Sequence, residues 1–281
     1  MDSFTRDGLR FDVRDHAPDA PTGTTGDDAP VVVLLHGFPQ DASAYDAVAP
    51  LLTAAGARVL VPDQRGYSPG ARPAGRRPYA VPELVADVVA LLDAAGAEQA
   101  HVVGHDWGGA VAWAVAAREP DRVATLTVLG TPHPAAMRAG LLRGGQALRS
   151  SYVGFFQLPG VPERLLLADD GARLRAALRR AGLEPDRADR YVARMREPGA
   201  LTAALAWYRA VPVPGGGSTR RIEVPTTYVS ARRDPFFAPA SVDATARHVD
   251  GSFLRVDLDA DHWLPEHRPA DVAAAVLGNL R

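Results

Sequence analysis

Gly104-His105-Asp106-Trp107-Gly108-Gly109 joins an expected strand at 101–103 to an expected helix at 110–118 through a sharp turn. Such a turn is strained and brings backbone close to backbone, so small residues are needed two positions before and two positions after its centre. The central side chain then projects freely, and the amino terminus of the helix stabilises an anion beside it. Asp106 occupies the centre, and we interpret it as a candidate nucleophile.

An aspartate at the start of a helix commonly serves as its N-cap, and for an isolated aspartate that interpretation is the better one. The five neighbours of Asp106, at the spacing of a strand-to-helix turn, favour the nucleophile instead. The residue type then indicates the reaction class. A serine that attacked an alkyl carbon would leave a stable ether, whereas an aspartate leaves an ester that water cleaves at its carbonyl.

Six apolar runs are typical of strands buried in a sheet. They cover residues 31–35, 58–61, 101–103, 123–129, 226–229 and 253–258. Between the second and third runs, the apolar residues of 81–92 keep helical spacing, with Pro82 in the first turn and Gly96 just past the end. This alternation predicts an α/β fold with a mostly parallel, doubly wound sheet, in which ligands sit at the carboxyl ends of the strands.

The alternation stops after the run at 123–129. The stretch from 131 to 217 carries arginine-rich helical patterns and no convincing strand, and it ends in the turn-rich residues 212–218. We therefore predict one core formed by residues 1–131 and 216–281, with residues 132–215 inserted as a helical cap.

The loop His36-Gly37-Phe38-Pro39 follows the first buried run. A loop in this position brings a backbone N–H toward the turn at Asp106, and we expect that N–H to belong to Phe38. Together with the N–H of Trp107 it would form an oxyanion hole, which stabilises the negative charge that develops when water attacks an ester carbonyl.

The activation of water requires a base, for which His262 is the candidate because it follows the last predicted strand. Asp234 follows the preceding strand, and we expect it to orient His262 and stabilise its charged form. Turn initiation before Pro235 is the alternative role for Asp234. Asp259 and Asp261 rank lower, because residues adjacent to a loop histidine usually point away from its ring.

The composition excludes several classes of function. The chain has 281 residues, 47% of them hydrophobic, a formal charge of −2 and no cysteine. It therefore has no thiol nucleophile, disulfide or thiolate metal site, and no basic field for nucleic acid or an anionic membrane. We expect no metal and, without a glycine-rich nucleotide motif, no cofactor. The amino-terminal segment lacks an apolar signal core, so we expect a cytoplasmic protein, with a homodimer left open as its assembly.

Four motifs occur together in one order: HGFP at 36–39, DQRGY at 63–67, GHDWGG at 104–109 and DHW at 261–263. With them the chain resembles the epoxide hydrolases of the α/β-hydrolase fold over essentially its full length. The resemblance implies hydrolysis of an apolar epoxide to a vicinal diol through a covalent aspartyl ester, with the epoxide and water as the only partners.

The resemblance also implies a helical cap that contributes two tyrosines, whose hydroxyls hold the epoxide oxygen. Tyr152, five residues before Gln157, matches the first, and Tyr208, within Trp207-Tyr208-Arg209, matches the second. Ordinary packing inside the cap is the alternative role for both. We expect the substrate pocket to be apolar and to include His36, Pro39, Phe155, Phe156 and Trp207.

Haloalkane dehalogenases are the closest alternative, because they resemble this chain in the aspartate nucleophile, Trp107 and the base. They must also bind a halide, commonly with an asparagine or a second tryptophan; here Phe38 stands at the asparagine position, and Trp207 is the only cap tryptophan. Fluoroacetate dehalogenases have arginines just after the nucleophile, which this chain lacks. A ligand-binding protein of this fold without turnover is a further alternative, disfavoured by the intact set of Asp106, Asp234 and His262.

Overall fold

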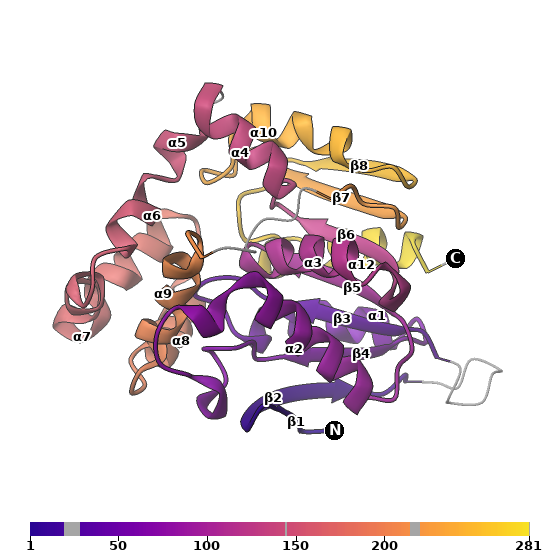
Figure 1. Ribbon diagram of the computed structural model, residues 1–281, viewed down its shortest axis with the longest axis horizontal. Coiled ribbons are helices and arrows are strands. Elements are labelled where there is room, and N and C mark those ends of the chain that lie inside the picture. Colours follow the sequence, from indigo (N-terminus) through magenta and orange to yellow (C-terminus); the bar gives the residue numbers. More distant parts are fainter. Residues whose placement is uncertain (20–28, 144, 214–219, 281) are drawn as a thin grey trace.

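The computed structural model describes residues 1–19, 29–143, 145–213 and 220–280, and its centre is an eight-stranded sheet (Figure 1). The strand order is β1(Ser3–Arg6), β2(Leu9–His16), β4(Arg58–Pro62), β3(Val31–Leu35), β5(Ala100–His105), β6(Val123–Leu129), β7(Thr226–Ala231) and β8(Phe253–Leu258). From β4 to β8 all neighbours run parallel, whereas β1 and β2 pair antiparallel. This confirms the predicted α/β fold with its mostly parallel sheet.

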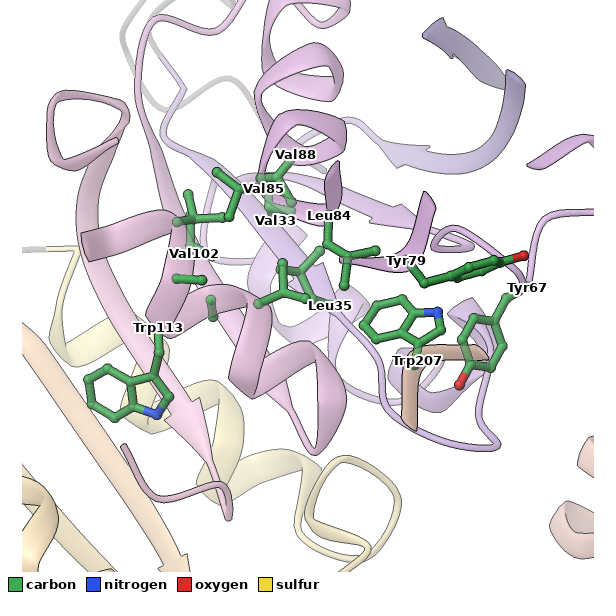
Figure 2. Packing of buried hydrophobic residues seen from close by; sticks show 14 of the residues in the cluster. Val33, Leu35, Tyr67, Tyr79, Leu84, Val85, Val88, Val102, Trp113 and Trp207 are labelled. Carbon is green, nitrogen blue, oxygen red and sulfur yellow. The ribbon is translucent and has the colours of Figure 1, made fainter. Parts of the chain in front are cut away.

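The central strands are buried on both faces because helices cover each side. Val33 and Leu35 join the apolar cluster of α2(Val81–Ala94) and α3(Trp107–Arg118), and Figure 2 shows them beside side chains of α2. Val32 and Leu34, which point the other way, join the cluster of α1(Ala49–Thr53) and α12(Pro269–Gly278). Each buried side chain of this size stabilises the fold by about 1.5–3 kcal/mol. Continuous burial explains the unbroken apolar runs of the sequence.

The structure contains two antiparallel strands, β1 and β2, that the sequence pattern did not predict. In β2, buried and solvent-facing residues alternate, so no apolar run marks the strand. Its Phe11 stacks on Phe4 of β1, with 4.6 Å between the ring centroids. The pair extends the sheet beyond β4 at the edge farthest from β8.

Between β6 and β7, the described residues form six helices. They are α4(Pro134–Arg143), α5(Gln146–Arg149), α6(Ser151–Phe156), α7(Val161–Arg180), α8(Pro185–Met195) and α9(Ala200–Ala210). The backbone of α7 leaves helical geometry from Ala168 to Gly171. In Figure 1, α6 to α9 gather beyond one end of the sheet, while α4 and α5 lie beside α10. The predicted return at 212–218, with the boundary at 215 and 216, falls largely outside the described residues.

The other helices of the described residues are α10(Pro239–Ala244) and α11(Leu264–His267), with short 3-10 helices at Ala42–Tyr45, Pro69–Ala71, Arg77–Tyr79, Pro120–Arg122 and Thr245–His248. One apolar cluster runs without a break from the sheet into α8 and α9, where it includes Tyr191 and Trp207. Figure 2 shows Trp207 beside Tyr67 and Tyr79. Within the described residues, no helix combines the length and the apolar character that crossing a membrane requires.

Candidate active site

Asp106 lies at the turn between β5 and α3 with φ of 52° and ψ of −119°, a left-handed backbone conformation that is rare outside glycine. The flanking positions require glycine, because a β-carbon at either one would overlap neighbouring backbone atoms. A β-carbon on Gly104 would lie 2.2 Å from the oxygen of Gly108, and one on Gly108 would lie 2.1 Å from the oxygen of Leu35. The strain at such a residue costs about 1–3 kcal/mol, which the surrounding packing must offset.

One oxygen of the Asp106 carboxylate is held by the backbone. The N–H of Phe38 donates to Oδ1 over 2.8 Å, and the N–H of Trp107 also bonds the carboxylate. Gly37 permits this approach, since a β-carbon there would lie 2.3 Å from the β-carbon of Asp106. Burial raises the pKa of Asp106, while the nearby His262 and the two N–H groups oppose that rise. The structure thus brings Phe38 and Trp107 to the predicted position.

His262 lies between two carboxylates. Its Nδ1 is 2.8 Å from Oδ2 of Asp234, and its Nε2 is 3.8 Å from Oδ2 of Asp106. Asp234 also accepts the N–H of Phe236, which fixes its orientation. Burial lowers the pKa of His262, but Asp234 and Asp106 outweigh that effect and raise it to about 9. Asp261, the lower-ranked alternative, faces Nδ1 of His267 instead, at 2.8 Å.

Tyr152 of α6 and Tyr208 of α9 lie beside each other, with 5.9 Å between their ring centroids. Both line the cavity that contains Asp106. Burial raises the pKa of both hydroxyls, and hydrogen bonding with the Trp107 side chain only partly offsets the effect at Tyr208. Both groups therefore stay protonated at neutral pH and can donate hydrogen bonds.

The cavity has a volume of about 450 Å³ and is mostly apolar. Besides Asp106 and the two tyrosines, its walls come chiefly from α3, the 131–134 loop and α4, and include Trp107, Ala110, Trp113, Ala114, Thr131, His133, Met137, Arg138 and Leu141. Sequence reasoning missed the walls from α3 and α4, because no motif shows which face of one helix packs over another.

The five side chains predicted to line the pocket are not among the lining residues of this cavity. His36 is fully buried, where its Nε2 accepts the N–H of Gln64. The indole N–H of Trp207 donates to the oxygen of Arg65 over 2.8 Å. Phe156 packs behind Tyr208, with 4.9 Å between ring centroids. Pro39 and Phe155 are likewise absent from the cavity wall.

A buried network that the sequence analysis did not anticipate supports the site from behind. Gln40 accepts the N–H of Gly37 over 2.8 Å and donates to Glu266 over 2.8 Å. Its side-chain oxygen also lies 2.9 Å from Nδ1 of His105. Glu266 further accepts the hydroxyl of Tyr191 from α8 over 2.9 Å, which ties the cap to the core. Gln40 directly follows the HGFP motif, but nothing in the sequence links it to Glu266.

In the part of the chain that the structure describes, no group of three or more histidine and acidic side chains is arranged to hold a metal ion. The site brings together a carboxylate, a histidine and two hydroxyl donors around one cavity.

Three features define a protein of the alpha/beta hydrolase fold: a mostly parallel sheet, a strained turn that presents an acid, and a histidine that follows the last strand. A family model described by that name matches residues 30–269, and the chain belongs to this family. The chain is 37% identical to AB hydrolase superfamily protein YfhM of Bacillus subtilis, over 91% of each chain. It is 33% identical to Epoxide hydrolase A of Mycobacterium tuberculosis, over 89% of each chain.

A solved structure agrees with these relatives. The crystal structure of Epoxide Hydrolase A from Mycobacterium thermoresistibile superposes with a TM-score of 0.82 at 28% identity, covering 99% of this chain and 97% of that one. An epoxide hydrolase from Bacillus megaterium superposes with a TM-score of 0.85 at 22% identity, which is a likeness of fold.

Proposed function

We propose that this protein is an epoxide hydrolase that converts an apolar epoxide to a vicinal diol through a covalent ester on Asp106. The observation that carries the proposal is that the two carboxylate oxygens of Asp106 have different neighbours. Oδ1 accepts the N–H of Phe38, whereas Oδ2 faces Nε2 of His262 at 3.8 Å. Oδ2 is thus the oxygen available to attack. The named epoxide hydrolases among the relatives support the same reaction.

In the first step, Oδ2 of Asp106 attacks an epoxide carbon from the side opposite the ring oxygen. The new bond forms as the carbon–oxygen bond of the ring breaks, and the electron pair moves to the departing oxygen. Tyr152 and Tyr208 donate hydrogen bonds to that oxygen, and one of them supplies its proton. Their raised pKa values keep them protonated for this task.

In the second step, His262 takes a proton from water, and the resulting hydroxide attacks the ester carbonyl. Negative charge develops on Oδ1, where the N–H of Phe38 stabilises it, and the N–H of Trp107, which also bonds this carboxylate, adds to the stabilisation. The bond between the acyl carbon and Oδ2 then breaks, and the departing oxygen takes the proton of the newly added hydroxyl group, so the diol leaves and Asp106 is again a carboxylate. His262 keeps the proton that it took from water, which restores its charged resting state.

The change in charge at Asp106 during the cycle lowers the pKa of His262 before the step that requires a base. Before the first step, the negative charge of Asp106 helps to hold the pKa of His262 near 9. Formation of the ester removes that charge, so the pKa of His262 falls. The histidine therefore gives up its proton in the intermediate, through water, to the tyrosine that supplied one in the first step. The neutral ring can then accept a proton from water in the second step.

Dehalogenation is less well supported, because the indole N–H of the cap tryptophan already has a hydrogen-bond acceptor. The indole N–H of Trp207 donates to the oxygen of Arg65 and is not free to hold a halide. The Trp107 side chain hydrogen bonds with Tyr208. Phe38 offers no side-chain donor at the position where dehalogenases commonly have asparagine.

The test is a single turnover in oxygen-18 water with styrene-type, aliphatic and terpenoid epoxides, followed by mass spectrometry of the active-site peptide. We expect an unlabelled diol and one label in Asp106, and then a labelled diol when the recovered enzyme reacts in ordinary water. Asp106→Asn serves as the control that forms no ester. Halide release from haloalkanes without diol formation from any epoxide would reject the proposal.

A further inference from the structure

Gln146, the first residue of α5, is fully buried against the loop that follows β7. Its Nε2 donates to the main-chain oxygen of Phe236 over 2.8 Å, and its Oε1 accepts the N–H of Ala238 over 2.8 Å. One amide thus bonds the backbone on both sides of Phe237, which lines the cavity. A buried side chain of this length has lost its rotamer freedom, so these two bonds fix the loop relative to α5.

The backbone that Gln146 bonds leads directly to the acid of the site. The N–H of Phe236 donates to Oδ1 of Asp234 over 2.7 Å, and Oδ2 of Asp234 lies 2.8 Å from Nδ1 of His262. The Phe236 ring also packs against the His262 ring, with 4.6 Å between the centroids. A shift of the Phe236 backbone therefore moves both the carboxylate that orients His262 and the ring that packs on it.

Arg149, at the other end of α5, bonds the same loop. Its Nη1 donates to the main-chain oxygens of Asp234 over 3.2 Å and of Pro235 over 2.7 Å. Gln146 and Arg149 are three positions apart, so their side chains lie on the same face of the helix. This face of a cap helix is thus bonded along the loop from 234 to 238.

Gln146 also bonds the start of the helix that carries the first tyrosine. Its Nε2 donates to the hydroxyl of Ser150 over 2.9 Å, and Ser150 directly precedes α6, which contains Tyr152. The ring of Tyr152 packs against the ring of Phe236, with 5.9 Å between the centroids. The groups proposed for ring opening and for ester hydrolysis therefore meet at one buried amide.

We propose that Gln146 is a positioning residue, which fixes the Asp234 loop and the start of the Tyr152 helix in one relative placement. Two of its three side-chain bonds go to the Asp234 loop, so it acts chiefly through Asp234 on His262 and hence in the hydrolysis of the ester. The assignment to a catalytic step rests on the proposed function, whereas the effect on His262 does not. A residue of the cap thus completes the orientation of a base that belongs to the core.

Titration of His262 by NMR tests the positioning without turnover. Gln146→Met keeps the length of the side chain and removes its three hydrogen bonds. We expect the pKa of His262 to fall below its wild-type value of about 9, because the contact with Asp234 weakens as the loop shifts. Gln146→Asn keeps an amide that is too short to bond both Phe236 and Ala238, so it should fold and show a smaller fall.

Gln157 provides the matched control, because it is a glutamine of the cap whose Nε2 donates within the cap, to the oxygen of Tyr208 over 2.8 Å. Gln157→Met should lower the melting temperature but leave the pKa of His262 in place, which separates positioning from a general loss of stability. An unchanged pKa of His262 in the folded Gln146 variants, or an equal fall in Gln157→Met, would overturn the proposal.

Single-turnover kinetics with styrene oxide test the catalytic step. In Gln146→Met we expect ester hydrolysis to slow by about 10- to 100-fold and ester formation to slow less. The ester then accumulates, so kcat and KM fall together. Gln157→Met should keep the wild-type rate of ester hydrolysis.

The two readouts distinguish the positioning role from the proposed function. A lower pKa of His262 in Gln146→Met, with no epoxide consumed by the wild type, rejects the proposed function but not the positioning role. Epoxide hydrolysis by the wild type, with the pKa and the rate of ester hydrolysis unchanged in Gln146→Met, rejects the positioning role but not the proposed function.

Discussion

Nε2 of His105 lies 2.8 Å from the main-chain oxygen of His262. On the other side of the ring, Nδ1 faces the side-chain oxygen of Gln40, which also accepts the N–H of Gly37. The loop of the candidate base, the turn of the nucleophile and the loop that carries the Phe38 N–H therefore share one buried set of hydrogen bonds. A displacement of any one of them alters the distances that catalysis requires at the other two.

Gln40→Leu should lower both stability and turnover. The change removes the acceptor of the Gly37 N–H and takes one hydrogen bond each from the ring of His105 and the carboxyl of Glu266, all in a buried position. We expect the free energy of unfolding to fall by about 3 kcal/mol, and kcat to fall more than KM rises, because the Phe38 N–H shifts. Gln99→Leu, at a surface hydrogen bond to Asp121, is the control and should change little. An unchanged kcat would contradict the role given to Gln40.

Gly37→Ala should abolish activity in a folded protein. The new methyl group would lie 2.3 Å from the β-carbon of Asp106 and 2.5 Å from Oδ1, so the nucleophile has to move. We expect kcat to fall by at least about 100-fold, since one misplaced reacting group costs that much. In Gly104→Ala the clash is with the backbone of Gly108, so folding itself should fail.

Gly154→Ala is the matched control for both glycine variants, because no atom lies within 4 Å of a β-carbon at that position. It should leave activity and melting temperature close to the wild-type values. Circular dichroism and a steady-state assay separate the three outcomes.

The stability that His262 contributes should depend on pH in a defined direction. Its pKa is raised in the folded protein from 6.5 to about 9. The charged histidine therefore stabilises the fold fully below about pH 6.5, and this contribution is lost as the pH rises through about 9. We expect the difference in melting temperature between the wild type and His262→Gln to be largest at the acidic end of this window and to shrink across it. A difference that grew with pH would contradict the raised pKa.

Asp106→Asn should lower the pKa of His262, since it removes one of the carboxylates that raise that pKa. Asp234→Asn should lower it further, because the charge and hydrogen bond of Asp234 make the larger contribution. NMR titration of the ring measures both. Asp261→Asn is the control, since that carboxylate faces His267 and should leave the pKa of His262 in place.

The double variant Tyr152→Phe with Tyr208→Phe should stop ring opening while the protein still folds. Both hydroxyls are protonated donors in the cavity, and loss of both removes the acid that stabilises the departing oxygen. We expect a decrease of about 1,000-fold or more in the rate of ester formation, measured in a rapid-mixing experiment. Tyr191→Phe, which deletes another buried hydroxyl, should reduce stability by about 1 kcal/mol and spare ring opening. Ester formation at the wild-type rate in the double variant would remove the tyrosines from the mechanism.

The sequence predicted the parallel sheet because a strand buried on both faces, such as Val31–Leu35, needs apolar residues at every position. It also predicted the turn at Asp106, since the contacts of Gly104 and Gly108 allow no side chain there. Chain order alone predicted Asp234 and His262. In the structure, the carboxylate of Asp234 lies 2.8 Å from the ring of His262.

The parts that the sequence did not predict depend on packing between distant segments. Gln40 and Glu266 are separated by 226 positions, and their hydrogen bond leaves no local pattern. The cavity walls depend on how α4 and the 131–134 loop face α3, which brings His133 and Arg138 into the wall while Trp207 turns toward Arg65. The antiparallel strand β2 lacked the apolar run that marked the central strands.

The bond from the Phe38 N–H to Oδ1 of Asp106 gives the two carboxylate oxygens different fates in the proposed cycle. Oδ2 leaves with each diol and is replaced by an oxygen atom from water. Oδ1 stays in the oxyanion hole and is retained from one cycle to the next. Each diol therefore contains an oxygen atom that entered the protein one turnover earlier. The isotopic composition of Oδ2 thus records the water of the preceding turnover, whereas Oδ1 keeps its original atom.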